Sequence, residues 1–196
     1  MLPVMHISGC RRDSLMSFDS SSRKIIQLPI SREEARKLRA GELLFLRGIL
    51  YTARDAAHMR MVDAISKGED LPFDLKDCAI YYAGPCPARP GCIIGSAGPT
   101  TSGRMDAYAP TLISLGQTVM LGKGLRKPEV IDAMKEFGAV YLGATGGAGA
   151  LLAQCIISSE IIAYPDLLAE AIRKIEVFDF PAIVLIDSVG TSLYDR

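Results

Sequence analysis

Apolar positions along the chain follow two alternating patterns. Some segments carry an apolar residue every three or four positions, as the buried side of a helix does, and others are short apolar or alternating runs, as strands are. Helices are expected over residues 31–39, 54–69, 102–116, 127–138 and 148–157. Strands are expected over residues 42–53, 77–85, 117–124, 139–147, 172–180 and 181–190. This alternation predicts an α/β domain in which helices flank a sheet.

Short signals at the segment ends support the expected helices. Ser31 and Glu34 have the spacing of a capping box ahead of the first helix. Gly68 and Gly138 follow segments with helical periodicity and are expected to end them, because glycine readily adopts the conformation that closes a helix. Pro110 falls inside the third expected helix, where it predicts either a kink or the end of a first segment.

The order of the strands also bears on the sheet and on where a ligand would bind. Only Pro181 stands between the last two expected strands, which suggests a mixed sheet. In α/β domains ligand-binding residues gather in loops at strand ends. Four such loops are rich in glycine or charge: those around Arg54 and over residues 95–106, 122–126 and 143–149.

Composition is typical of a globular protein and excludes several classes. Apolar residues make up 49% of the chain, charged residues 22%, and the formal net charge is zero, so neither nucleic acid nor an anionic membrane is an expected partner. No apolar run approaches the roughly 18 residues needed to span a bilayer. Residues 1–22 end in a serine-rich stretch and are expected to form a disordered leader, with a single domain over residues 23–196.

Cysteine usage predicts a cytoplasmic location and no metal site of the chain's own. The five cysteines are Cys10, Cys78, Cys86, Cys92 and Cys155. An odd number without a secretion signal favours reduced thiols in the cytoplasm. Five residues separate Cys86 from Cys92, which is not a zinc spacing, and the whole chain has only two histidines.

The glycine-rich stretch GATGGAGALLA, residues 143–153, follows a strand and opens a helix. It fails the dinucleotide pattern G-x-G-x-x-G, because Leu152 stands where the last glycine would be, and no P-loop pattern occurs either. Two interpretations remain open. The helix start could hold an anion through free N–H groups, or the glycines could allow the helix to pack closely on the strand, where only glycine fits.

Two arginines occupy positions that a helix dipole disfavours. Arg54 lies at a junction from strand to helix. The helix dipole favours the negative charge of Asp55 there but disfavours the positive charge of Arg54. Arg104 is expected in the first turn of the next helix, after Thr100, Thr101 and Ser102, of which capping needs only one hydroxyl. If the two junctions are adjacent, the arginines form a clamp for a carboxylate, which the guanidinium fork matches.

Two further residues near these junctions have less specific signals. Lys123 stands between two glycines at the end of an apolar strand. It is either a solvated lysine in a turn or a lysine aimed at an anion. His58 lies one turn after Arg54 and is expected to be structural rather than catalytic.

Taken together, these motifs resemble a known family. GPTTSGRMD, with YTARDAAH before it and LGKG and YLGATGGAGALLAQ after it, is similar in order and spacing to the β subunit, or C-terminal half, of class I fumarases and L-tartrate dehydratases. These are iron–sulfur-dependent hydro-lyases. The resemblance runs from about residue 25 to the end, and it implies a swivelling β/β/α domain.

The resemblance also implies an activity, a cofactor and a partner. The family reversibly adds water to a dicarboxylate double bond, as in fumarate to malate. It uses a [4Fe–4S] cluster held by the α subunit or N-terminal half. This chain is therefore expected to work in a heteromer, such as α2β2, and to be inactive alone.

Residue by residue, the family's site falls on four positions of this chain. The proposed catalytic base falls on Thr100, and the residues that bind substrate carboxylates fall on Arg54, Arg104 and Lys123. A threonine hydroxyl is a poor base in water and needs a nearby cation and a water-poor site, so a purely positioning role for Thr100 stays open.

Other functions remain as alternatives. Within the family, the chain could serve an L-tartrate dehydratase, although GRMD favours fumarase. Outside it, the same cations could form a non-catalytic anion-binding or regulatory module. A nucleotide-binding domain is disfavoured by the glycine patterns that fail.

Overall fold

The computed structural model describes residues 24–145 and 147–195, so the expected leader over residues 1–22 lies outside the described part. The strands are β1 (Lys24–Leu28), β2 (Leu43–Thr52), β3 (Ala79–Tyr81), β4 (Val119–Gly122), β5 (Val140–Gly143), β6 (Ile156–Ala163) and β7 (Ile172–Ile186). The α-helices are α1 (Arg32–Ala35), α2 (Asp55–Lys67), α3 (Ala109–Ser114), α4 (Pro128–Phe137) and α5 (Gly149–Gln154). Short 3-10 helices are η2 (Ser102–Met105), η3 (Pro165–Glu170) and η4 (Leu193–Asp195).

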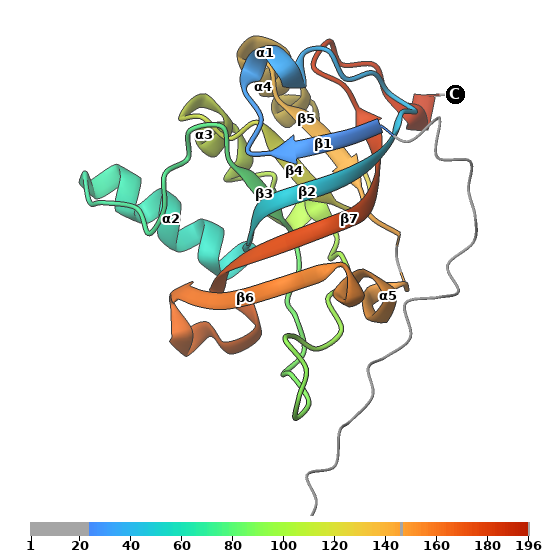
Figure 1. Cartoon of the computed structure of the whole chain (residues 1–196). Helices are drawn as coiled ribbons and strands as arrows, with labels where there is room; N and C mark the ends of the chain where they lie inside the picture. Colours follow the sequence, from blue (N-terminus) through green and yellow to red (C-terminus); the bar gives the residue numbers. More distant parts are fainter. Residues whose placement is uncertain (1–23, 146, 196) are drawn as a thin grey trace, which may run out of the picture.

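The strands form one mixed sheet, which confirms the expected fold class of a mixed sheet flanked by helices (Figure 1). Strands β1 to β5 are parallel to their neighbours in chain order. The long strand β7 runs antiparallel to β2, β5 and β6. Because β7 pairs with both β2 and β5, the strands β2, β3, β4, β5 and β7 close into a ring.

Two hydrophobic clusters hold this ring together. One contains residues from every strand of the ring, such as Leu46, Tyr81 and Leu142, and therefore fills its interior. The other joins the outer face of the strands to α2, α3 and α4, which lie on one side of the sheet in Figure 1. Adjacent residues such as Met120 and Leu121 belong to different clusters. Both faces are thus covered, which explains the continuous apolar runs in the sequence.

Most of the predicted helix ends are confirmed. Ser31 and Glu34 form the capping box, and Gly68 and Gly138 end α2 and α4 with φ of 69° and 78°. The first helix is shorter than expected, because the chain tightens into three-residue turns after Ala35 and buries Leu38. The expected helix over residues 102–116 divides into η2 and α3, and Pro110 lies in the first turn of α3, a position that suits proline.

The C-terminal region departs from the expectation of two strands. Residues 172–186 form the single strand β7, with Pro181 inside it. Pro181 lies between the stretch that pairs with β6 and the stretch that pairs with β5, where a missing N–H is tolerated.

Strand β6 was not expected. The helix predicted over residues 148–157 ends at Gln154, and β6 begins at Ile156. It pairs with β7 alone in the described sheet, and most of its residues are at least partly exposed. The edge position therefore leaves little of the apolar alternation that identifies a half-buried strand. Within the described ranges, no helix combines the length and the apolar character needed to cross a membrane.

Candidate active site at the carboxyl ends of the parallel strands

The predicted site residues all lie at one edge of the sheet, three of them in loops and Arg104 in the short helix η2. The ends of β2, β3 and β4 stand side by side, since Thr52 pairs with Tyr81 and Tyr81 pairs with Leu121, the residue before the last of β4. Arg54 follows β2, the 98–104 loop follows β3, and the loop with Lys123 follows β4. Loops at the carboxyl ends of strands are where α/β domains place ligand-binding residues, and the structure places these four residues there.

The loop that carries Thr100 is attached to the end of β3. Pro99 forms an antiparallel bridge with Ala83, and the Thr100 backbone N–H donates to the Tyr82 carbonyl over 2.7 Å. Thr100 itself is half-buried. Its backbone is therefore fixed relative to the sheet.

The other side of the same loop is attached beyond the end of β4. Thr101 forms a parallel bridge with Lys123, and the Ser102 N–H donates to the Lys123 carbonyl over 2.9 Å. The loop thus runs between the extensions of β3 and β4. This arrangement places the segment of Thr100 and Thr101 beside the segment that carries Lys123.

Arg54 approaches the loop from the β2 side and lies against Gly84. A Cβ atom at Gly84 would stand 2.9 Å from Nη1 and 3.0 Å from Cδ of Arg54, so a side chain there would displace the guanidinium. Gly84 follows Ala83, the residue that bridges Pro99. Arg54 and Lys123 therefore flank the 98–104 loop from opposite sides.

The charge of Arg54 is balanced by a carboxylate of the protein. Nη2 of Arg54 lies 3.1 Å from Glu170 Oε1 and 3.7 Å from Asp55 Oδ1, and the Ala56 N–H donates to Glu170 Oε2 over 3.1 Å. The positive charge of Arg54 therefore has a counter-charge from the protein and does not by itself require a bound anion. Glu170 was missed because it stands in η3, far along the chain, and no local pattern links it to α2.

Arg104 does not lie where the sequence placed it. It belongs to the four-residue helix η2 instead of the first turn of a long helix, so the argument from the helix dipole does not hold. No hydroxyl caps η2 either: Thr101 at the N-cap makes no side-chain bond. The Arg104 and Lys123 side chains are exposed, and neither has a hydrogen bond or ion pair within the described part of the chain.

The glycine-rich loop after β5 packs against the loop after β3. A Cβ atom at Gly149 would stand 2.6 Å from Ser96 Oγ and 2.7 Å from the Gly98 nitrogen, and the Ala97 N–H donates to the Gly149 carbonyl over 3.0 Å. Close packing thus explains the glycine at this position, although the partner is a loop and not a strand.

His58 is buried beneath Arg54. Its Nδ1 lies 2.9 Å from the Arg54 carbonyl, and because a carbonyl can only accept, Nδ1 carries the proton. Burial, together with the nearby Arg126, lowers the pKa of His58 to about 4. The imidazole is therefore neutral near pH 7, in agreement with the structural role expected from sequence.

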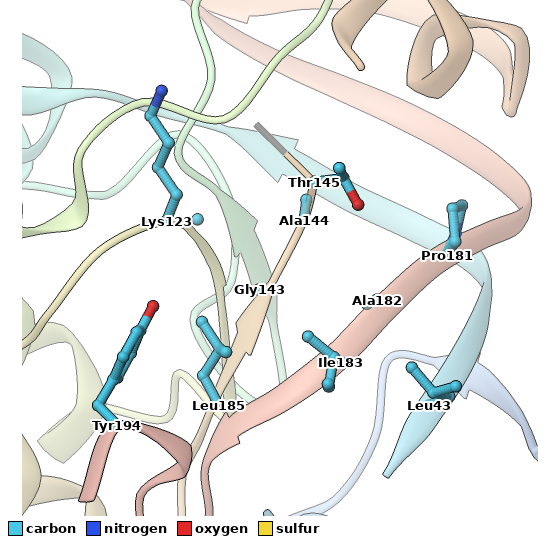
Figure 2. Close-up of a pocket in the computed structure, with 11 residues that line it drawn as sticks. Leu43, Lys123, Gly143, Ala144, Thr145, Pro181, Ala182, Ile183, Leu185 and Tyr194 are labelled. Atoms are coloured by element: carbon cyan, nitrogen blue, oxygen red, sulfur yellow. The ribbon is translucent and has the colours of Figure 1, made fainter. Parts of the chain in front are cut away.

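A mostly apolar cavity of about 360 Å³ adjoins the site. Its lining includes Leu43, Ile183, Leu185 and Tyr194, with Lys123 at the rim. In Figure 2 the Lys123 ammonium points away from Ile183 and Leu185. The lysine therefore contributes its aliphatic stem to the cavity and its charge to the surroundings.

The described residues do not suit an iron–sulfur cluster. Residues 24–145 and 147–195 contain no group of three or more histidine, cysteine or acidic side chains that could hold a metal ion. Cys86 and Cys92 are exposed, and burial raises the pKa of the Cys78 thiol. Such clusters are bound by several thiolates, so a cluster is not accommodated by these residues. Cys10 lies outside the described residues.

The chain matches one protein family and several of its members in sequence. The family model described as the fumarase C-terminus matches residues 11–196, a wider range than the motifs quoted above. The chain is 46% identical over 155 residues to the aerobic class I fumarate hydratase of Escherichia coli (strain K12), covering 78% of this chain and 28% of that protein. It is 38% identical over 199 residues to fumarate hydratase 2 of Leishmania major, covering 100% of this chain and 33% of that protein.

A third relative is much closer to this chain in length. The chain is 37% identical over 173 residues to a putative L(+)-tartrate dehydratase subunit beta of Methanocaldococcus jannaschii, covering 85% of this chain and 89% of that protein. The chain thus spans only a minor part of the fumarate hydratases it matches and most of this subunit.

Proposed function

The chain belongs to the fumarase C-terminus family, and from this premise we propose that it is the β subunit of a hydro-lyase that reversibly hydrates fumarate to malate. The names of its relatives support hydro-lyase chemistry. Its similarity to a protein named as a subunit beta supports a role in an enzyme of more than one subunit. The proposed substrate is a small dicarboxylate.

One observation carries the proposal: the 98–104 loop runs between the extensions of β3 and β4, with cations on both sides. Arg54 lies on one side of Thr100 and Lys123 on the other, and Arg104 follows in η2. Two exposed cations without internal partners in the described chain, together with a third held by Glu170, suit a dianion. A pyrophosphate or nucleotide would call for glycine patterns that the sequence lacks.

The proposed chemistry follows from these positions. Arg104 and Lys123 would bind a substrate carboxylate and stabilise the negative charge that develops on it when a proton leaves the adjacent carbon. Thr100 is the proposed base. Its backbone is held by Tyr82, and Lys123 beside Thr101 supplies the nearby cation that an acidic threonine hydroxyl requires.

The proposed cofactor, a [4Fe–4S] cluster, would be held by a partner α subunit, since the described residues of this chain do not suit it. When bound there, the cluster would act as a Lewis acid on the substrate hydroxyl and carboxylate. The half-buried Thr100 would gain a water-poor environment when this domain swivels onto the partner. The proposed assembly is a heteromer, such as α2β2, in the cytoplasm.

L-Tartrate dehydratase is a second candidate, which the relative from Methanocaldococcus jannaschii favours. Both substrates are dicarboxylates, so the same cations would serve. The two candidates predict different turnover with fumarate and L-tartrate.

The test is coexpression with an α-type partner that bears cluster cysteines, followed by assays with fumarate, L-malate and L-tartrate. The complex is expected to hydrate fumarate, and the chain alone is expected to be inactive. Hydration by the chain alone, or failure to form a complex, would contradict the proposal. A complex that binds dicarboxylates and turns over none would support a non-catalytic module instead.

A further inference from the structure

The backbone of η2 holds Arg104 only loosely. The Arg104 N–H reaches the Thr101 carbonyl over 3.4 Å, and the Asp106 N–H reaches the Gly103 carbonyl over the same distance of 3.4 Å. Backbone hydrogen bonds usually measure about 2.9 to 3.0 Å. The position of Arg104 must therefore depend on contacts made at the two ends of this short helix.

At the C-terminal end, Asp106 ties η2 to the loop after β4. Arg126 Nε donates to Asp106 Oδ1 over 2.7 Å, and the Lys127 N–H donates to Oδ2 over 2.9 Å. The side chains of Arg126 and Asp106 are 0% and 2% exposed. Both oxygens of this buried carboxylate thus hold the loop that begins with Lys123.

The same guanidinium also contacts the β3 side of the site. Its central carbon lies 5.3 Å from the ring centroid of Tyr82 and 5.0 Å from that of Tyr141, and Nη1 lies 3.3 Å from Met120 Sδ. The Tyr82 carbonyl accepts the Thr100 N–H. Arg126 therefore contacts both Tyr82, which holds the Thr100 backbone, and Asp106, which holds the loop that begins with Lys123.

At the N-terminal end, Ser102 ties η2 directly to Lys123. The Lys123 N–H donates to Ser102 Oγ over 3.1 Å, and the Tyr141 hydroxyl lies 2.8 Å from the same oxygen. Any Cβ atom at Gly122 would collide with Ser102 Oγ, so a glycine is needed there. Both ends of η2 are consequently joined to the segment that carries Lys123.

Stability alone does not account for the Asp106–Arg126 pair. A buried ion pair loses much of its hydration, and replacing both partners with apolar residues of similar volume is often neutral or stabilising. Removing one partner is costly, because the other charge stays buried. A pair of this kind can instead specify one local geometry.

We propose that the buried Asp106–Arg126 pair is a positioning pair that holds Arg104 at a set place relative to Lys123, so that both cations meet one dianionic substrate. The inference rests on the proposed function, because it assigns to these two cations a common ligand. Neither Asp106 nor Arg126 needs to touch the substrate in this role.

The test compares single and double replacements in the assembled enzyme. D106L should lower the melting temperature, because Arg126 loses its counterion, and D106L/R126M should recover it. The double variant should still show a KM for fumarate raised roughly 10- to 100-fold, with a smaller change in kcat. R126K, which keeps the charge, should raise the KM for fumarate less than R126M does. D63N/K67Q, which removes an exposed pair on α2, is the matched control and should leave KM unchanged.

A double variant with recovered melting temperature and the KM and kcat of the natural chain would overturn the positioning role. Failure of the natural complex to hydrate fumarate would instead refute the proposed function. In that event, calorimetric titration with L-malate tests positioning alone. D106L/R126M is then expected to bind L-malate about 10-fold more weakly, and equal affinities would overturn the inference.

Discussion

The two sides of the 98–104 loop hold their cations in different ways. On the β2 side, Arg54 lies against Gly84 and is paired with Glu170 over 3.1 Å. On the β4 side, Arg104 and Lys123 are exposed and have no side-chain partner among the described residues. The first cation is oriented and partly neutralised before any ligand arrives. The other two have no counterion among the described residues, and the position of Arg104 depends on the contacts that Ser102 and Asp106 make at the two ends of η2.

The largest effect is expected at Thr100, which stands between the two sides. T100A should lower kcat by roughly 10² to 10⁴-fold, the usual contribution of a general base, and should leave assembly intact. T100S keeps the hydroxyl and should retain a substantial part of the activity. Turnover and complex formation are measured on the same preparations. Full activity in T100A would remove the base assignment. The cations on both sides of the 98–104 loop would then act only in binding.

On the β4 side, R104M should lower kcat/KM by roughly 10² to 10³-fold, because it removes an unpaired charge at the site. Its melting temperature should equal that of the natural chain, since the Arg104 side chain is exposed and unpartnered among the described residues. R104K keeps the charge without the planar fork, so its kcat/KM should lie between those of R104M and the natural chain. A large loss of stability in R104M would contradict the picture of a free cation.

On the β2 side, R54M should reduce both activity and stability. The half-buried Glu170 loses its counterion, and the free energy of unfolding should fall by roughly 1 kcal/mol. Thermal unfolding of R54M and R104M side by side makes the comparison direct. Equal melting temperatures in the two variants would mean that the Arg54–Glu170 pair does not stabilise the fold.

A smaller effect is expected at Glu170 itself. E170Q keeps an acceptor for Arg54 and for the Ala56 N–H but removes the negative charge. The KM for the dianion should therefore fall roughly 2- to 5-fold. E170A also loses the acceptor and should raise KM instead. A rise of KM in both variants would show that the charge of Glu170 matters for orientation more than for neutralisation.

The smallest effect at neutral pH concerns His58, which supports the Arg54 backbone. Burial lowers its pKa from 6.5 to about 4, so between these values the unfolded chain binds a proton that the folded chain does not. The free energy of unfolding should therefore fall as the pH drops through this window, by up to roughly 1.4 kcal/mol per pH unit. Denaturant titrations of the natural chain and H58Q measure this slope. An unchanged slope in H58Q would assign the acid sensitivity to another group.

Sequence reasoning was most accurate where a signal is local. The capping box at Ser31 and the glycine stops at Gly68 and Gly138 were found because each depends on a few neighbouring residues. It was least accurate at η2, where three hydroxyls suggested a helix cap. The Ser102 hydroxyl instead binds the Lys123 segment and lies beside Tyr141. Nothing within a few residues of Ser102 signals such partners.

The sequence by itself determined the α/β class, the family, and the four residues proposed for the site. Periodicity, caps and motifs are properties of short stretches, and short stretches are what a sequence displays. The tertiary structure alone decided that Glu170 neutralises Arg54 and that Asp106 and Arg126 form a buried pair. It also decided that β7 closes the ring. These features join segments far apart in the chain, and only the parallel register of β2, β3 and β4 brings their loops to one edge.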